Sequence, residues 1–385
     1  MLQEQILRTL ENLDNIDQRK LSRVANVTES TVSRYLNGHE EMKFESVLKM
    51  VKYLYPQQEK EVMSKYILTQ RSKNARHSLE YAVMNQLWDE LEQIIELLSS
   101  SSNPADKEWA TMYDLIYIRK QQLLSPIEQL NKVEVFKPKE TEMQIMKSLV
   151  KGYIYNDLGE RFSIFLHIED AEANISNLKS SFLKDSFTVR LGLLMGYVTL
   201  LENRILESRN FNTAILKQDF FEDVKATANH NLGLSYFFED YQVALNYFNK
   251  ALDFYLYHDH TIRIRQVRLN LSLLMSYWNI KFDYTQPIGN HSSFLNYTFY
   301  LIKKGELALA NEYLSKTSVG ELAEWDKAFY YYYKGLLTSE LSLYYSSVEL
   351  FLKIDDYFHA QLPLLELQKL GENEIALRIL STRRK

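Results

Sequence analysis

The sequence predicts an all-α protein, and three observations support this. Hydrophobic residues make up 46% and charged residues 25% of the 385 positions, which is an ordinary balance for a folded protein. Only 11 Gly and 6 Pro are present, so there are few breakers to interrupt helices. Amphipathic stretches follow one another with short gaps from Gln57 onward. The length is sufficient for two or three domains.

Composition and charge exclude several classes of protein. The chain has no Cys, so it forms neither disulfides nor thiolate metal sites, and we expect a reducing compartment. The first residues, MLQEQILRTLENL, carry charges and lack the apolar core of a secretory signal. The apolar run at 191–201 is too short to cross a bilayer. We therefore expect a cytoplasmic protein with no membrane partner.

The segment LSRVANVTESTVSRYLNG, residues 21–38, has the pattern of a helix-turn-helix. Ser22 is small enough for the helix contact, and Asn26 tolerates the left-handed conformation that the turn requires. Thr28 is a good N-cap for the second helix, and Asn37-Gly38 is a good stop. Apolar residues at helical spacing would hold both helices to a core: Leu21, Ala25, Val27, Val32, Tyr35 and Leu36.

The polar side of this segment has the chemistry of a DNA-reading surface. Short hydrogen-bonding side chains and arginines suit base edges and phosphates. Residues 1–56 carry equal numbers of acidic and basic residues, so one such domain would bind DNA weakly and a dimer is expected. The predicted DNA-binding residues are Arg23, Thr28, Ser30, Thr31, Ser33, Arg34, Asn37 and Lys43.

A further helix is expected to begin at Lys43 and Phe44 and to close the N-terminal bundle. It contributes Val47, Leu48, Val51 and Leu54 to the core, and Pro56 ends it. We predict a helix-turn-helix domain over residues 1–56. A purely structural helical cap on the rest of the chain is the alternative.

The stretch NHNLGLSYFFEDYQVALNYFNKALDFY, residues 229–255, has tetratricopeptide spacing. Gly233, Ala244 and Ala251 would let two helix backbones approach while aromatic residues fill the remaining space. Weaker copies place Gly335 with Ser347 and Phe351, and Ala310 with Leu314. We predict a tetratricopeptide-like, right-handed superhelical solenoid over residues 57–360, whose concave face binds an extended peptide. For most tyrosines, packing of helix against helix is the simpler role.

No catalytic motif is present. The sequence lacks a glycine-rich phosphate loop, an HExxH motif and a nucleophile elbow. His258 and His260 do not share a helix face, so no metal site is expected. We predict neither enzymatic activity nor a cofactor.

Four segments resemble the arbitrium receptors (AimR) of temperate Bacillus phages, within the RRNPP group of peptide-sensing regulators. They are KNARHSLEYA (73–82), YLNGHEEMKF (35–44), DYQVALNYFNKAL (240–252) and DDYFHAQLPLLELQKLGEN (355–373). The resemblance extends over nearly the whole chain, and the last segment is its most specific part. It implies a dimeric transcription factor that binds operator DNA when free of peptide. A short secreted phage peptide, typically ending in Arg-Gly-Ala, would bind the solenoid and end activation, which favours lysogeny.

The same resemblance implies the peptide-binding residues. Arg76 corresponds to an arginine and Asp356 to an aspartate that contact the peptide. A guanidinium can clamp the peptide's carboxylate, and a carboxylate can hold its arginine; an ion pair within the solenoid is the alternative role for each. The middle repeats depart from the family pattern at Tyr197, Asp223 and Leu234. The candidate contacts there are Tyr197, Asn203, Asn229 and Asn231.

The C-terminal segment, residues 361–385, is rich in leucine. One helix pair at the end of a stack cannot bury so much apolar surface, so we predict that part of it forms a two-fold dimer contact. An ordinary cap on the last repeat is the alternative. The predicted dimerisation residues are Leu362, Leu365, Leu370, Leu377 and Leu380.

A second hypothesis is a peptide-regulated inhibitor that binds a response regulator or a phosphatase and does not bind DNA. Related solenoids use an N-terminal helical bundle in that way. An inhibitor has no need of a polar recognition helix, so the segment at residues 21–38 favours the transcription factor.

Overall fold

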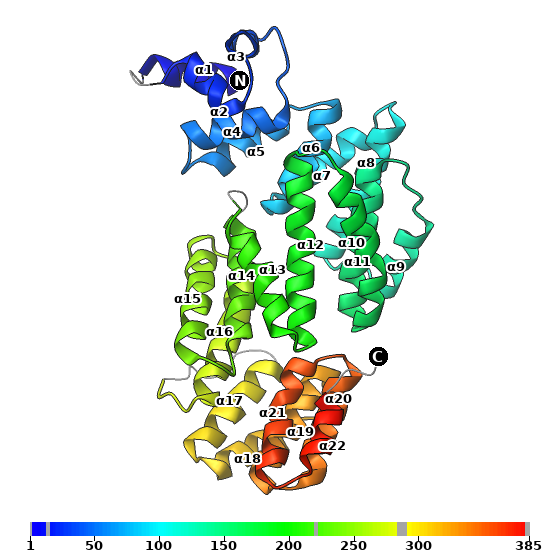
Figure 1. Ribbon diagram of the computed structural model, residues 1–385, viewed down its shortest axis with the longest axis vertical. Coiled ribbons are helices and arrows are strands. Elements are labelled where there is room, and N and C mark those ends of the chain that lie inside the picture. Colours follow the sequence, from blue (N-terminus) through cyan, green and yellow to red (C-terminus); the bar gives the residue numbers. More distant parts are fainter. Residues whose placement is uncertain (1, 13–15, 219–221, 283–290, 382–385) are drawn as a thin grey trace. The chain divides into compact units, whose positions relative to one another are not determined.

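The computed structural model describes residues 2–12, 16–218, 222–282 and 291–381, and within these ranges it contains helices and no strand. The predicted all-α class is confirmed. The chain forms two compact units. Figure 1 labels their helices and colours them in chain order. Unit 1 comprises residues 1–158 and 163–191, and unit 2 comprises residues 159–162 and 192–385.

The N-terminal part of unit 1 is a four-helix bundle. Asp17 caps the second helix by accepting a hydrogen bond from the Lys20 N–H at 2.7 Å. Apolar side chains of all four helices are buried in its core, and the Ser46 hydroxyl donates to the Ala25 carbonyl at 3.0 Å. The helices are α1 (Leu2–Asn12), α2 (Gln18–Ala25), α3 (Glu29–Leu36) and α4 (Phe44–Leu54).

The rest of unit 1 consists of helices that pack mainly on their sequence neighbours. Pro104 and Pro126 each begin a helix, and Ser125 forms a capping box with Glu128. The helices are α5 (Glu59–Ile67), α6 (Ser72–Met84), α7 (Trp88–Ser99), α8 (Pro104–Lys120), α9 (Pro126–Val135), α10 (Thr141–Leu158) and α11 (Arg161–Asn177). Helix α12 (Phe182–Leu201) begins in unit 1 and ends in unit 2.

Unit 2 continues as successive antiparallel helix pairs, as the solenoid prediction requires. Its helices are α13 (Ile205–Leu216), α14 (Glu222–Ser235), α15 (Tyr241–Tyr257), α16 (Thr261–Tyr277), α17 (His291–Lys304), α18 (Leu307–Ser315), α19 (Glu324–Thr338), α20 (Leu341–Lys353), α21 (Tyr357–Lys369) and α22 (Glu374–Ser381). A single 3₁₀ turn, η1 (Val319–Glu321), precedes α19.

Close helix contacts occur where the repeat spacing predicts them. A Cβ added to Gly233 on α14 would lie 2.7 Å from the Phe248 ring on α15, and one added to Gly335 on α19 would lie 2.9 Å from the Tyr344 ring on α20. Ala244, Ala251 and Ala310 are fully buried. Small residues therefore set the distance between the helices of each pair, and the aromatic rings fill the space between the helices.

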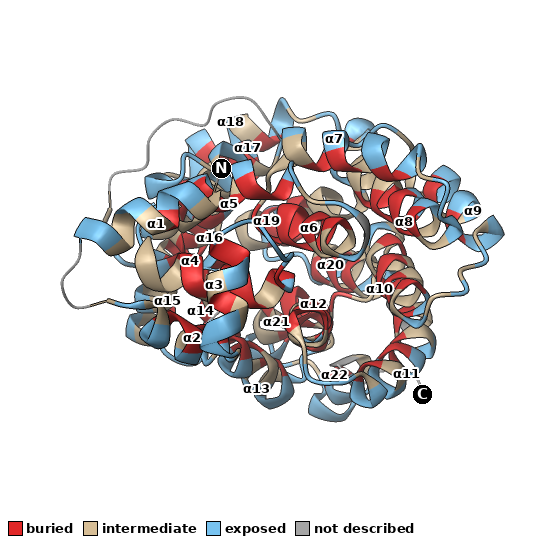
Figure 2. Cartoon of the chain, turned by 90° about the horizontal axis from the view of Figure 1, so that it is seen from above, coloured by how far each residue is buried: buried red, intermediate tan, exposed pale blue. Residues whose placement is uncertain are grey.

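Many aromatic side chains lie inside this packing. Tyr255 and Tyr333 are almost completely buried, and Phe299 stacks on Tyr333 with ring centroids 5.1 Å apart. In Figure 2 the buried positions follow the helix faces that meet other helices. For these tyrosines, helix packing accounts for the side chain.

The domain boundaries predicted from sequence can be compared with the helices. Residue 56 lies between α4 and α5, whereas residue 361 lies within α21. Residues 382–385 of the predicted C-terminal segment lie outside the described residues.

Candidate functional site

Helices α2 and α3 form the predicted helix-turn-helix geometry. Asn26 adopts the left-handed conformation, with φ 54° and ψ 49°, and its N–H contacts the last carbonyls of α2. The Thr28 hydroxyl caps α3 by accepting from the Thr31 N–H at 3.2 Å. Gly38, with φ +74°, follows the end of α3. Asn26, Thr28 and Gly38 therefore adopt the left-handed, capping and positive-φ conformations that their residue types favour.

The predicted DNA-binding side chains lie on the outer side of this motif. Six of them are exposed and two, Thr31 and Ser33, are half-buried. Some of their hydrogen-bonding capacity is used locally, because the Asn37 amide donates to the Ser33 carbonyl at 2.8 Å. The exposed residues are Arg23, Thr28, Ser30, Arg34, Asn37 and Lys43.

Acidic residues accompany the arginines of this surface. Arg34 Nε lies 2.9 Å from Glu40 Oε2, and Arg19 Nε lies 3.5 Å from Glu29 Oε1. All four side chains are exposed, so these pairs are worth little and can open when phosphates approach. The surface offers arginines together with short polar groups, without a strong positive field.

Helix α6 joins the N-terminal bundle to the solenoid through one of its faces. Asn74 accepts from the Phe44 N–H at 3.1 Å and donates to the Met42 carbonyl at 3.0 Å. The rings of His77 and Tyr81 lie 6.0 Å and 5.9 Å from the Phe44 ring. Positions 74, 77 and 81 are three and four residues apart and share a side of the helix. We call them the bundle-facing stripe of α6.

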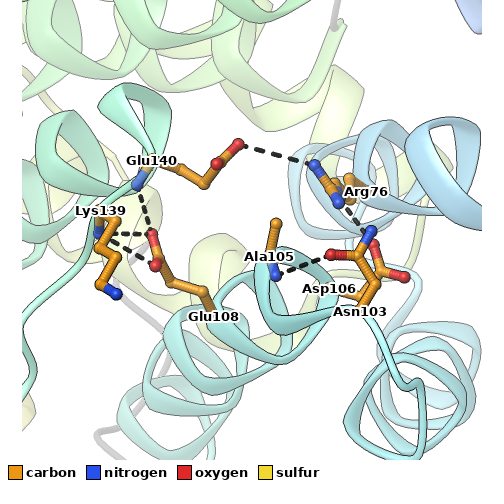
Figure 3. Close-up of polar contacts among 7 residues, drawn as sticks. All are labelled: Arg76, Asn103, Ala105, Asp106, Glu108, Lys139 and Glu140. Carbon is orange, nitrogen blue, oxygen red and sulfur yellow. Dashed lines mark hydrogen bonds and ion pairs between the residues drawn. The ribbon is translucent and has the colours of Figure 1, made fainter.

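Another face of α6 carries Arg76, the predicted peptide-binding arginine (Figure 3). Its Nε donates to Asp106 Oδ1 at 2.7 Å, and its Nη1 lies 3.6 Å from Glu140 Oε2. Asp106 is on α8 and is buried, and its second oxygen accepts from the Ser101 hydroxyl at 2.8 Å. Arg76 therefore occupies a small acidic site inside unit 1.

Glu108 fixes the backbone beside this site. Its carboxylate accepts from the Lys139 N–H at 2.9 Å and from the Glu140 N–H at 2.7 Å, just before α10 (Figure 3). Negative charge at a helix N-terminus is favourable because the free N–H groups there point outward. Glu108 consequently holds the segment that presents Glu140 to Arg76.

One turn further along α6, Glu80 forms a buried ion pair with Arg190 on α12. Arg190 Nε and Nη2 donate to the two carboxylate oxygens at 2.7 Å and 3.0 Å, and the Tyr113 hydroxyl donates at 2.6 Å. Ser186 adds a further short hydrogen bond. Burial raises the pKa of Tyr113, with Glu80 adding to the effect, so its phenol remains a neutral donor. Positions 76 and 80 share a side of α6, which we call the polar stripe.

In unit 2, Asp356 caps the start of α21. Its Oδ1 accepts from the His359 N–H at 3.0 Å, its Oδ2 lies 2.7 Å from His359 Nδ1, and Trp325 Nε1 donates to Oδ2 at 3.2 Å. The side chain is almost completely buried. This carboxylate is therefore rigidly held, with aromatic groups around it.

The four candidate peptide-binding residues of the middle repeats have different environments. Asn231 is buried and its amide donates to Asn212 Oδ1 at 3.1 Å, so its side chain is engaged between helices. Asn203 is exposed and has φ 59° in the turn after α12. Tyr197 on α12 and Asn229 on α14 are half-buried. Asn231 is therefore the least accessible of the four side chains, and Asn203 is the most exposed.

A polar group on α14 and α16 escaped the sequence analysis. Asn270 Nδ2 lies 2.7 Å from His230 Nε2, and Arg263 donates to Gln266 at 3.0 Å. Burial, together with a smaller contribution from the charge of Arg263, lowers the pKa of His230 to about 3, so the imidazole is neutral. The signal that could have found the group is the arginine-rich start of α16, TIRIRQVR.

The predicted dimerisation leucines divide by exposure. Leu362 and Leu377 are buried in the core of unit 2, and Leu365 and Leu380 are half-buried. Leu370 is 46% exposed, as are two residues of α22 that the sequence analysis did not select, Ile375 at 61% and Ile379 at 66%. The apolar surface offered to solvent at this end is therefore carried by Leu370 and the isoleucines.

Comparison with known proteins identifies the family. The model of the AimR family, described as AimR transcriptional regulator-like, matches residues 59–369. The chain belongs to the AimR family. The family is one of transcriptional regulators.

Individual relatives support this membership in the AimR family. The AimR transcriptional regulator of Bacillus phage phi3T is 29% identical over 339 residues, which cover 87% of this chain and 88% of the relative. A solved structure of selenomethionine phAimR matches with a TM-score of 0.79 at 27% identity, covering 99% of this chain and 100% of that one. A structure of phAimR with a ligand matches with a TM-score of 0.73 at 27% identity, covering 86% and 98%.

Two features are absent from the described residues of this AimR-family chain. No described helix is both long and apolar enough to cross a membrane. Among the same residues, no group of three or more His, Asp or Glu side chains is placed to hold a metal ion.

Proposed function

We propose that this AimR-family chain is a DNA-binding regulator of a temperate phage, acting in the cytoplasm of the bacterial host. It senses a short secreted peptide in its solenoid and controls the choice between lysis and lysogeny. The observation that carries the proposal is the helix-turn-helix geometry at Asn26, with a polar outer face, on a chain of this family.

A homodimer is part of the proposal. One bundle with balanced charge and paired arginines makes few phosphate contacts, so affinity must come from two bundles on one operator. Two-fold symmetry would place two recognition helices about one DNA turn apart.

The DNA-binding part is tested by fluorescence anisotropy with duplex promoter DNA. Arg34→Ala removes a recognition-helix cation and should weaken binding about tenfold or more. Arg265→Ala, at an exposed position of helix α16, is the matched control and should bind like the wild type. Equal affinity of all three proteins would contradict the assignment of α3. No binding to DNA by any protein, with retained binding of a host protein, would favour the inhibitor hypothesis.

For peptide binding, we propose that Arg76 binds the peptide's C-terminal carboxylate and that Asp356 binds the peptide's arginine. Tyr197, Asn203, Asn229 and Asn231 are proposed as secondary contacts, with Asn231 the weakest because its amide is already engaged. Helix α6 supports a regulatory role, because the stripe beside Arg76 holds the DNA-binding bundle.

The peptide site is tested by calorimetry with a hexapeptide ending in Arg-Gly-Ala. Asp356→Asn is the informative variant, because asparagine keeps the cap of α21 and removes the charge. We expect at least a tenfold loss of affinity, and no further loss when the peptide's arginine is also replaced. Asp355→Asn removes the same charge from the same turn and serves as the control. An unchanged affinity of Asp356→Asn would exclude this carboxylate from the site.

A further inference from the structure

The two acidic partners of Arg76 hold it differently. Asp106 receives a hydrogen bond from Nε at 2.7 Å, whereas Glu140 lies 3.6 Å from Nη1, beyond hydrogen-bond range. A guanidinium carries five N–H donors, so the edge that faces Glu140 is incompletely used. Arg76 thus has one firm contact and one loose contact.

The firm partner is buried and the loose partner is accessible. The Asp106 side chain is 6% exposed and is also held by Ser101, whereas the Glu140 side chain is 39% exposed. The backbone of Glu140 is fixed by Glu108, but Arg76 is the one ion-pair partner of its carboxylate among the described residues. The Glu140 side chain can therefore rotate into solvent without disturbing α10.

The charges around Arg76 determine whether a second carboxylate can bind beside Glu140. In Figure 3, Arg76 is the cation that contacts Asp106 and Glu140, while Glu108 and Lys139 add one further carboxylate and one further cationic side chain to the group. A second anion placed against the guanidinium would face Glu140 at short range, and like charges this close repel strongly in a partly buried site. Binding thus requires the Glu140 carboxylate to leave.

We propose that Glu140 is an internal stand-in for the peptide's terminal carboxylate. It occupies the outer edge of Arg76 in the peptide-free chain and is displaced when a carboxylate binds there, while Asp106 keeps the guanidinium in place. This inference rests on the proposed function and names its regulation: Glu140 lowers the affinity of the site, so that a higher concentration of peptide is needed to fill it.

The inference predicts a specific effect of charge. Glu140→Gln keeps the size of the side chain and removes the repulsion, so a peptide with a free C-terminal carboxylate should bind about tenfold more tightly. A C-terminally amidated peptide carries no terminal charge, and its affinity should be the same for both proteins. Glu172→Gln, which removes an exposed charge from α11, is the matched control and should behave like the wild type.

The test is calorimetry of the full chain with the free-acid and amidated forms of a hexapeptide ending in Arg-Gly-Ala. Circular dichroism melting checks that each variant is folded. The expected result is tighter binding of the acid alone by Glu140→Gln, with a gain that shrinks at high salt. Equal or weaker binding of the acid, or an equal gain for both peptides, would overturn the role of Glu140 and leave the proposed function intact. Failure of the wild type to bind either peptide would instead overturn the proposed function, and this inference with it.

Discussion

At the residue scale, His77 shows how the bundle contact depends on an uncharged side chain. Its ring lies against Phe44 and Phe182, and its Nδ1 has no hydrogen-bond partner among the described residues. Burial lowers its pKa to about 4, and the charge of Lys73 acts in the same direction. The imidazole is therefore neutral at physiological pH, because a proton would have to be buried among aromatic rings.

The pKa of His77 predicts a loss of stability in mild acid. Between about pH 6.5 and pH 4 the unfolded chain binds a proton at His77 and the folded chain does not, so the free energy of unfolding falls with the pH. At pH 5 the expected loss from this residue is about 2 kcal/mol relative to pH 7. Urea unfolding at both pH values should show a smaller drop for His77→Phe than for the wild type. His39→Gln, at an exposed position, should keep the wild-type drop, and an equal drop in all three proteins would contradict the assignment.

At the element scale, pairs of helices are spaced by the absence of a side chain. Gly233 meets the fully buried ring of Phe248, so a Cβ at position 233 would force the ring or one of the two helices to shift. Alanine is the better helix former by about 1 kcal/mol, so local propensity alone would favour it at position 233. Packing opposes that preference.

Gly233→Ala is expected to destabilise unit 2 by about 1 to 2 kcal/mol, because overpacking outweighs the gain in helix propensity. Gly320→Ala is the matched control, since a Cβ there meets no atom within 4 Å and should change stability little. Thermal unfolding followed by circular dichroism measures both. A Gly233→Ala protein as stable as the wild type would show that α14 and α15 can separate.

Local patterns predicted the elements well, and they failed where partners are distant in sequence. Asn26, Thr28 and Gly233 could be assigned because a turn, a cap or a repeat spacing is encoded within a few residues. The partner of Arg76 is 30 residues away and the partner of Glu80 is 110 residues away. Nothing local distinguishes Asp106 or Glu140 from the many other acids of the chain. The sequence could therefore offer an ion pair as the alternative role of Arg76, but it could not name the partners.

At the scale of the whole molecule, the predicted dimer contact at Leu362, Leu365, Leu370, Leu377 and Leu380 can be refined, and we propose that the exposed apolar residues of the C-terminal helices carry it. Leu370, Ile375 and Ile379 expose large side chains, whereas Leu362 and Leu377 already stabilise unit 2. Substitutions at the buried pair would test folding and not assembly. Substitutions at the exposed positions can change assembly without changing the folding of unit 2.

Ile375→Glu should convert the dimer to monomer at micromolar concentration, because a charge buried at a two-fold contact faces its own copy. Sedimentation velocity measures the state. Ile127→Glu, at a similarly exposed isoleucine of α9, should leave it unchanged. A dimer that persists in Ile375→Glu, or a wild type that is monomeric, would contradict the proposed contact.

The bundle-facing stripe and the polar stripe of α6 also restrict which insertions this helix can accept during evolution. One inserted residue turns everything after it by about 100° around the helix axis. An insertion between Asn74 and Tyr81 would thus break either the contacts of α6 with the Phe44 segment or the hydrogen bond from Arg76 to Asp106. On the proposed function, lineages that acquire a new peptide signal should therefore keep the length of this segment fixed and vary by substitution.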